Sequence, residues 1–166
     1  MRELFLVRHA KSSWDYPDLR DEERPLGARG KSDAPFMARI LLEKGFVPDK
    51  LVSSTARRAQ DTANHFARVY QIDPRDVALV ARVYEAMPDD LMEVVHGLSD
   101  EWGTVFLFGH NPGFTVFANR FAEGFRFDNV PTCGIVRILS EASSWQDVTP
   151  GQARVDSWYF PKEYRI

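Results

Sequence analysis

Three short segments of the chain carry residue types that together could bind a doubly charged anion. In each segment an apolar run ends and basic side chains follow, at Arg8-His9, Arg57-Arg58 and His110. Ligands of open α/β sheets bind outside the carboxyl ends of the strands, so we expect these three places to meet in one pocket. Two histidines and two or three arginines would give that pocket a binding site for a dianion with a nucleophile inside it.

Arginine and histidine suit different parts of phosphoryl transfer, in which little other covalent work is left to the protein. The planar guanidinium binds phosphate oxygens in pairs and stays charged at working pH. Histidine can attack phosphorus when its attacking nitrogen is unprotonated. Because neighbouring cations disfavour the imidazolium, we expect Arg8 and Arg58 to lower the pKa of His9 and so to prepare it for attack.

These residues depend on strands and helices that alternate along the chain. The alternation predicts an α/β fold, a three-layer α/β/α sandwich whose central sheet is mostly parallel with an antiparallel edge strand. Between the first strand and the first helix lies a polar stretch from Lys11 to Gly30, and connections of that length are often functional. The strands are expected at Glu3–Val7, Lys50–Ser53, Val77–Val83, Thr104–Phe108, Gly134–Leu139 and Arg154–Phe160.

Helical spacing of apolar residues predicts four helices between the strands. The first ends near Gly45 and has Pro35 in its first turn. The second takes Ser54 or Thr55 as its cap. The third opens at Pro88, where proline and acidic residues suit a helix start. The apolar stripes of the first, second and fourth helices are Met37-Ile40-Leu41, Ala59-Ala63-Phe66-Tyr70 and Phe114-Phe117-Ala118-Phe121, respectively.

Size, charge and cysteine content limit the classes of protein to which the chain can belong. The 166 residues suffice for one hydrophobic core, and we expect a single domain over residues 1–166. A net charge of −3 gives no global attraction to nucleic acid or to an anionic membrane. The lone Cys133 excludes an internal disulfide and suits a reducing compartment. Because we find neither a secretion signal nor a run of about 20 apolar residues, we expect a cytoplasmic protein.

Four motifs in order make the chain similar to the histidine phosphatase superfamily, the group that holds phosphoglycerate mutases and acid phosphatases. Arg8-His9-Ala10 stands where the family has Arg-His-Gly, with alanine replacing the glycine. Arg24–Gly30 resembles the family's Pro-Leu-Thr-x-x-Gly element, with Gly27 in place of threonine. Ser54–Thr62 matches Ser-x-x-x-Arg-Ala-x-x-Thr, and Gly109–Gly113 matches the segment with the second histidine. Over essentially its whole length the chain looks like the small SixA-type phosphohistidine phosphatases.

The resemblance implies a catalytic role for four residues. His9 would accept the phosphoryl group and become a transient phosphohistidine, which water then hydrolyses. Arg8, Arg58 and His110 would hold the phosphoryl oxygens. The register of the motif assigns Arg58 to the phosphate, although its neighbour Arg57 is an open alternative.

The resemblance also suggests three residues at the margin of the site. Ser12 would add a hydroxyl contact to the substrate. Asn111 lies beside the pocket, either to bind substrate or only to shape its turn. Glu85 stands near the place where many relatives keep an acid that protonates a departing alkoxide, and a surface carboxylate is its alternative role.

We favour a phosphatase that acts on phosphohistidine of a signalling protein such as a phosphotransfer domain. Imidazole departs readily once its far nitrogen is protonated, so this reaction could proceed without Glu85. The alternatives are a hydrolase of small phosphomonoesters with Glu85 as proton donor, and a non-catalytic module that senses phosphate. No metal and no cofactor are expected. Glu93 and His96 have the i, i+3 spacing of carboxylate-bridged metal sites, but such a site needs a second copy and the sequence has one. The histidines and the cysteine show no zinc-type spacing.

Overall fold

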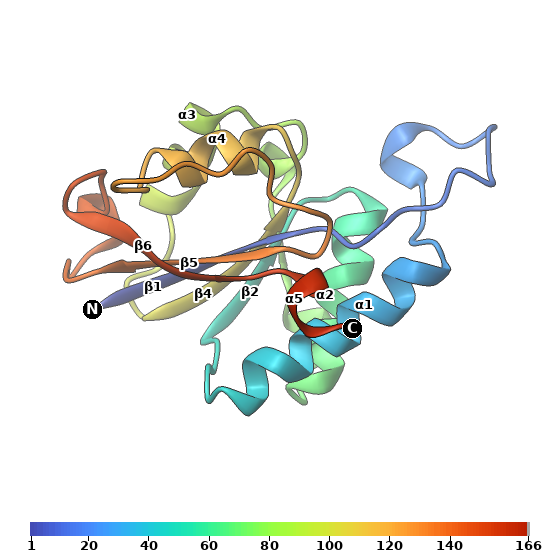
Figure 1. Cartoon of the computed structure of the whole chain (residues 1–166), viewed down its shortest axis with the longest axis horizontal. Coiled ribbons are helices and arrows are strands. Elements are labelled where there is room, and N and C mark those ends of the chain that lie inside the picture. Colours follow the sequence, from blue (N-terminus) through green and yellow to red (C-terminus); the bar gives the residue numbers. More distant parts are fainter. Residues whose placement is uncertain (166) are drawn as a thin grey trace.

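A six-stranded sheet forms the centre of the protein (Figure 1). The computed structural model describes residues 1–165. The strands are β1 (Arg2–Arg8), β2 (Lys50–Ser53), β3 (Ala78–Leu79), β4 (Thr104–Gly109), β5 (Ile135–Ser140) and β6 (Ala153–Tyr159). They lie in the order β3-β2-β4-β1-β5-β6.

The expected mostly parallel sheet is confirmed. Strands β3, β2, β4 and β1 are parallel neighbours, whereas β5 pairs antiparallel with both β1 and β6. The reversed strand therefore lies next to the edge, and the edge strand β6 is antiparallel to its neighbour.

Helices cover both faces of the sheet and complete the three layers. They are α1 (Ala28–Glu43), α2 (Arg57–Val69), α3 (Pro88–His96), α4 (Gly113–Asn119) and α5 (Pro161–Tyr164). Helices α1 and α2 lie on one face, and α3 and α4 lie on the other (Figure 1). Among the described residues, none of these helices is both long and apolar enough to cross a membrane.

The central strands are buried on both faces, which explains their nearly continuous apolar sequence. On β1, Phe5 and Val7 belong to the core under α1 and α2, while Leu4 and Leu6 belong to the core under α3 and α4. All four side chains are at most 1% exposed. Burial on both sides fixes the position of β1, and with it the direction in which the chain leaves the sheet at Arg8.

The first helix begins earlier than its apolar spacing indicates. Helix α1 starts at Ala28, so the expectation that Pro35 lies in the first turn is wrong. Proline inside a helix removes one backbone hydrogen bond. The helix continues through it because Ala34, Met37 and Ala38, on either side of the proline, are fully buried, and tertiary packing outweighs local propensity.

The third expected strand is mostly wrong. Only Ala78–Leu79 pairs with β2, and a 3-10 turn at Ala81–Val83 follows. Val83 is 1% exposed and packs in the core under α3 and α4. Its apolar character thus serves core packing outside a strand, a distinction that a short apolar run does not reveal.

Candidate active site

The carboxyl ends of three neighbouring strands bring the predicted catalytic residues together. Arg8 ends β1 and His9 follows it, while His110 follows β4, which is the parallel neighbour of β1. Arg58 lies in the first turn of α2, directly after β2 on the other side of β4. The ring centroids of His9 and His110 are 5.2 Å apart. All of these side chains but that of Arg8 are buried.

His9 has one ring nitrogen committed to the backbone and the other free. Its Nδ1 lies 2.8 Å from the carbonyl oxygen of Ala10, which only accepts, so Nδ1 carries the proton and Nε2 carries the lone pair. Burial lowers the pKa of His9 to about 4, and the charges of Arg58 and Arg8 add to this effect, although the bond to Ala10 opposes it. At neutral pH the imidazole is therefore uncharged and able to attack through Nε2.

Thr62 joins the segment after the nucleophile to helix α2. Its Oγ1 accepts a hydrogen bond from the Ala10 N–H at 3.0 Å and donates one to the carbonyl oxygen of Arg58 at 2.8 Å. Ala10 is fully buried, so this turn accommodates the alanine that replaces the family's usual glycine. The threonine thus fixes the distance between the nucleophile and Arg58.

Helix α2 turns its two adjacent arginines in different directions. The Arg58 guanidinium is buried, and its two terminal nitrogens donate to the Asp21 carbonyl oxygen at 2.7 Å and to Asp21 Oδ2 at 2.9 Å. The Arg57 side chain is 57% exposed and pairs with Asp61 at 3.5 Å. The structure therefore buries Arg58 near His9 and His110 and leaves Arg57 on the outer side of the helix.

Ser54 holds the second histidine instead of capping α2. The Nε2 atom of His110 lies 2.8 Å from Ser54 Oγ, and the same oxygen accepts the N–H of Ala56 at 3.1 Å. The residue at the cap position of α2 is Ala56, so the expected cap at Ser54 or Thr55 is wrong. Burial lowers the pKa of His110 to about 3, and the neighbouring His9 and Arg58 contribute to this shift.

Two buried nitrogens of the site have no hydrogen-bond partner among residues 1–165. They are Nε of Arg8 and Nδ1 of His110. A terminal nitrogen of the same arginine donates to the Val130 carbonyl oxygen at 2.9 Å, which anchors the side chain. Because buried polar groups are nearly always paired, each of these two nitrogens has the capacity for one further hydrogen bond, such as one to an anion.

We expect the free energy of unfolding to fall as the pH drops from about 6.5 toward 4. The pKa values of His9 and His110 are about 4 and 3 in the folded chain, against 6.5 for a free imidazole. The unfolded chain therefore takes up protons in this range that the folded chain does not bind, and each unit of difference costs about 1.4 kcal/mol.

Urea unfolding at pH 7.5, 5.5 and 4.5 measures this loss, which we expect to reach a few kcal/mol at the lowest pH. A His9→Gln variant lacks one of the two groups and should lose less stability over the same interval. If the variant and the original chain lost the same amount, His9 would not be held uncharged by burial.

Sequence patterns did not assign a role to a second group of polar residues around Arg58. Asp21 accepts from the Tyr84 hydroxyl at 2.7 Å and from Arg24 at 3.2 Å, in addition to Arg58. The Tyr84 ring lies edge-on to His110, with centroids 5.6 Å apart. The length of the polar stretch between β1 and α1 was the only signal for Asp21, because its partners Arg58 and Tyr84 are far away in sequence.

The three residues expected at the margin of the site occupy different places. The Ser12 hydroxyl accepts a hydrogen bond from the Arg24 guanidinium at 2.6 Å. Its contact is therefore with this arginine. The Asn111 amide donates to Asn129 and Val130, which occupies both of its hydrogens and favours the turn-shaping role. Glu85 is exposed and follows Tyr84 with a positive φ of 56°, a backbone conformation that non-glycine residues rarely adopt.

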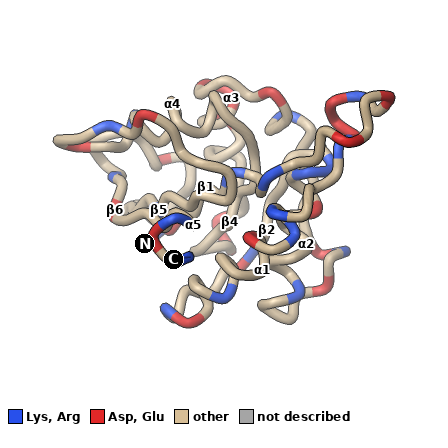
Figure 2. Tube along the Cα trace, turned by 45° about the vertical axis from the view of Figure 1, so that its right-hand side comes forward, with Lys and Arg blue, Asp and Glu red and all other residues tan. Residues whose placement is uncertain are grey.

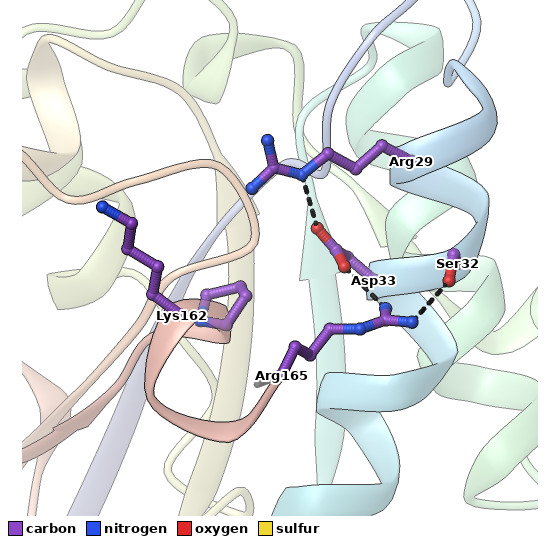
Figure 3. Close-up of a pocket in the computed structure, with 6 residues that line it drawn as sticks. Arg29, Ser32, Asp33, Lys162 and Arg165 are labelled. Carbon is purple, nitrogen blue, oxygen red and sulfur yellow. Dashed lines mark hydrogen bonds and ion pairs between the residues drawn. The ribbon is translucent and has the colours of Figure 1, made fainter.

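A separate polar pocket of about 280 Å³ lies between α1 and α5 (Figure 3). Asp33 is buried there and binds Arg165 at 2.7 Å and Arg29 at 3.4 Å. The ion pair with Arg165 attaches the segment after α5 to α1. None of the residues predicted to bind phosphate lines this pocket.

Comparisons with known proteins identify the family of the chain. Residues 4–86 match the model of the histidine phosphatase superfamily (branch 1). The chain belongs to the histidine phosphatase superfamily. It is 31% identical to the uncharacterized protein Rv1276c of Mycobacterium tuberculosis, an alignment that covers 94% of this chain and 100% of that protein. Membership makes the chain a phosphatase that acts on phosphorylated molecules.

Two solved structures show that the fold of this superfamily member is SixA-like. The protein histidine phosphatase SixA, complexed with tungstate, superimposes with a TM-score of 0.83 at 16% identity, over 98% of this chain and 99% of that one. The mycobacterial glucosyl-3-phosphoglycerate phosphatase Rv2419c gives a TM-score of 0.69 at 16% identity, over 96% and 99%. At such identities the likeness concerns the fold.

Proposed function

We propose that this superfamily member removes phosphoryl groups through a covalent phosphohistidine at His9, without a metal. The observation that carries the proposal is the fixed orientation of His9, in which Nδ1 donates to Ala10 and Nε2 is free. In the first step the Nε2 lone pair forms a bond to phosphorus while the bond to the leaving group breaks. In the second step water attacks the phosphoenzyme and releases phosphate.

The surrounding cations suit the charge of the transferred group. Arg8, Arg58 and His110 would hold the phosphoryl oxygens, and the positive charge of the two arginines would attract a phosphate dianion. A module that only senses phosphate would need this charge, but it would not need a neutral imidazole with a free nitrogen beside it. The prepared nucleophile therefore favours an enzyme over a sensor.

We further propose phosphohistidine on a phosphotransfer protein as the substrate. Within residues 1–165, each connection between parallel strands holds one helix of the layers and at most short 3-10 turns, so no inserted helical subdomain covers the strand ends. Strand ends without such a subdomain suit a side chain that protrudes from a partner protein. The reducing cytoplasm, which suits the single buried Cys133, is the compartment we propose.

The substrate proposal is tested by comparing kcat/KM on a phosphohistidine-bearing phosphotransfer domain with kcat/KM on sugar and aryl phosphates. We expect the phosphorylated protein to be the better substrate. Faster turnover of small esters than of the protein would instead support the alternative function, a phosphomonoester hydrolase. An absence of turnover with every substrate, together with tight phosphate binding, would support the sensor.

Replacing Glu85 with glutamine separates the two leaving groups. An alkyl ester such as a sugar phosphate releases a poor alkoxide leaving group that needs a proton, whereas protonated phosphohistidine does not. We therefore expect Glu85→Gln to reduce ester hydrolysis by about 10² or more and to change phosphohistidine hydrolysis little. Glu123→Gln, at an exposed position elsewhere, is the control, and equal losses on both substrates would contradict this assignment.

A further inference from the structure

Asp21 lies at the rim of the proposed phosphate site, on a segment that the motifs do not explain. It opens the 3-10 turn Asp21–Glu23 in the long connection between β1 and α1, which projects beyond the ends of the strands (Figure 1). Acidic and basic positions are mixed along this projecting connection (Figure 2). Among the acidic ones, Asp21 is in contact with the proposed phosphate ligand Arg58, through both its carbonyl oxygen and its carboxylate.

The carboxylate faces the outer side of the site. The Asp21 side chain is 53% exposed, whereas that of Arg58 is 10% exposed and His9 is 8% exposed. In phosphoryl transfer the attacking and leaving atoms lie roughly in line on opposite sides of phosphorus. Because His9 is buried, a leaving group opposite it would depart toward solvent, and the half-exposed Asp21 carboxylate also faces solvent.

The carboxylate is held in place and keeps its negative charge. Burial opposes ionisation, but hydrogen bonds from Tyr84 and Arg58 outweigh it and lower the pKa of Asp21 to about 2. Its oxygens accept three side-chain hydrogen bonds, from Tyr84, Arg58 and Arg24. A carboxylate offers about four acceptor positions, so one is left for a donor on a bound molecule.

We propose that Asp21 is a specificity-determining residue that favours substrates whose leaving group carries a positive charge next to phosphorus. This inference rests on the proposed function, and it assigns recognition of the protonated imidazole of phosphohistidine to the Asp21 carboxylate. The far imidazole N–H donates to the carboxylate, which keeps that nitrogen protonated. When His9 Nε2 bonds to phosphorus, the electron pair of the substrate's N–P bond returns to the departing nitrogen, and neutral imidazole leaves.

A different role for Asp21 would be to position Arg58 alone. That role predicts equal losses for every substrate, because every phosphoryl group uses the same arginine. Recognition of a cation predicts unequal losses, since an aryl phosphate has no positive charge beside phosphorus. The ratio of the two rates therefore separates the two roles.

The experiment measures kcat/KM for N-phosphoimidazole and for p-nitrophenyl phosphate between pH 5.5 and 8.5. For Asp21→Asn we expect both values to fall, with a loss on N-phosphoimidazole that is about fivefold greater, a size typical of a partly exposed charge pair. The pH above which N-phosphoimidazole hydrolysis declines should also move down, because the substrate proton is held less firmly. Asp21→Glu keeps a carboxylate at this position, so its ratio of kcat/KM on N-phosphoimidazole to kcat/KM on p-nitrophenyl phosphate should lie between those of the original protein and Asp21→Asn. Asp18→Asn, on the same connection, is the control for the loss of a negative charge alone.

Each outcome bears on a different proposal. Equal losses on both substrates, with an unmoved pH profile, would overturn the role of Asp21 while the phosphohistidine substrate stood. If the unmodified enzyme preferred p-nitrophenyl phosphate to N-phosphoimidazole, the proposed substrate would fail and the recognition by Asp21 would fail with it. If Asp21→Asn did not fold, Asp21→Glu would separate the two roles. A displaced carboxylate should lower the ratio of the two kcat/KM values if Asp21 recognises the cation, and should leave the ratio unchanged if Asp21 only positions Arg58.

Discussion

Replacing His9 with alanine is expected to reduce kcat by about four orders of magnitude or more, the scale seen when a covalent nucleophile is removed. The loss follows from the geometry, because His9 is the imidazole whose Nδ1 is fixed by a backbone carbonyl and whose Nε2 is free to attack. Steady-state hydrolysis of a phosphohistidine protein and of p-nitrophenyl phosphate, measured in parallel, shows whether both substrates depend on it.

The matched control is His65→Ala, which removes an imidazole from α2 away from the strand ends. We expect this variant to keep activity within about twofold of the original, as a partly exposed residue outside the site should. Substantial residual turnover in His9→Ala, well above that of the uncatalysed reaction, would show that another group makes the bond to phosphorus. In that case His9 would not be the nucleophile.

The second large effect is expected at the adjacent arginines of α2. Arg58→Lys keeps the charge but loses the planar fork that can hold phosphate oxygens and Asp21 at once. We expect kcat/KM to fall about 10²- to 10³-fold, the cost of removing one preorganised donor of a transition-state oxyanion. Phosphate binding, followed by the rise in Tm with added inorganic phosphate, should weaken in parallel.

Arg57→Lys is the control for this substitution, because Arg57 is exposed and retains a cation to pair with Asp61. It should change kcat/KM by less than about twofold. The opposite result, a large loss at Arg57 and a small one at Arg58, would mean that helix α2 presents its other face to the substrate.

The fold could be predicted from the sequence where the chain is buried on both faces. The strands β1 and β4 are apolar runs that end at Arg8 and Gly109, and their ends carry the histidines. The parallel order followed from alternation of strands and helices. The strand expected at Val77–Val83 was too long, because a two-residue strand and a buried 3-10 turn have the same apolar composition.

The site was predictable to the extent that its residues lie directly after strands. His9 and His110 follow β1 and β4, so their meeting was implied by the sheet alone. Asp21, Tyr84 and Thr62 were given no role, because their contacts join segments distant in sequence. Their function depends on how the connection after β1 folds back over α2, which neither periodicity nor spacing reveals.

The central claim is that His9 carries the phosphoryl group during turnover. A rapid-quench experiment with a phosphotransfer domain labelled on its phosphohistidine tests this most directly, with the protein and its His9→Ala variant compared side by side. We predict transient label on the unmodified protein, in an acid-labile and base-stable bond that fragmentation mass spectrometry locates at His9, and no label on the variant. Label at another residue, or release of labelled phosphate from the variant at the original rate, would contradict the account.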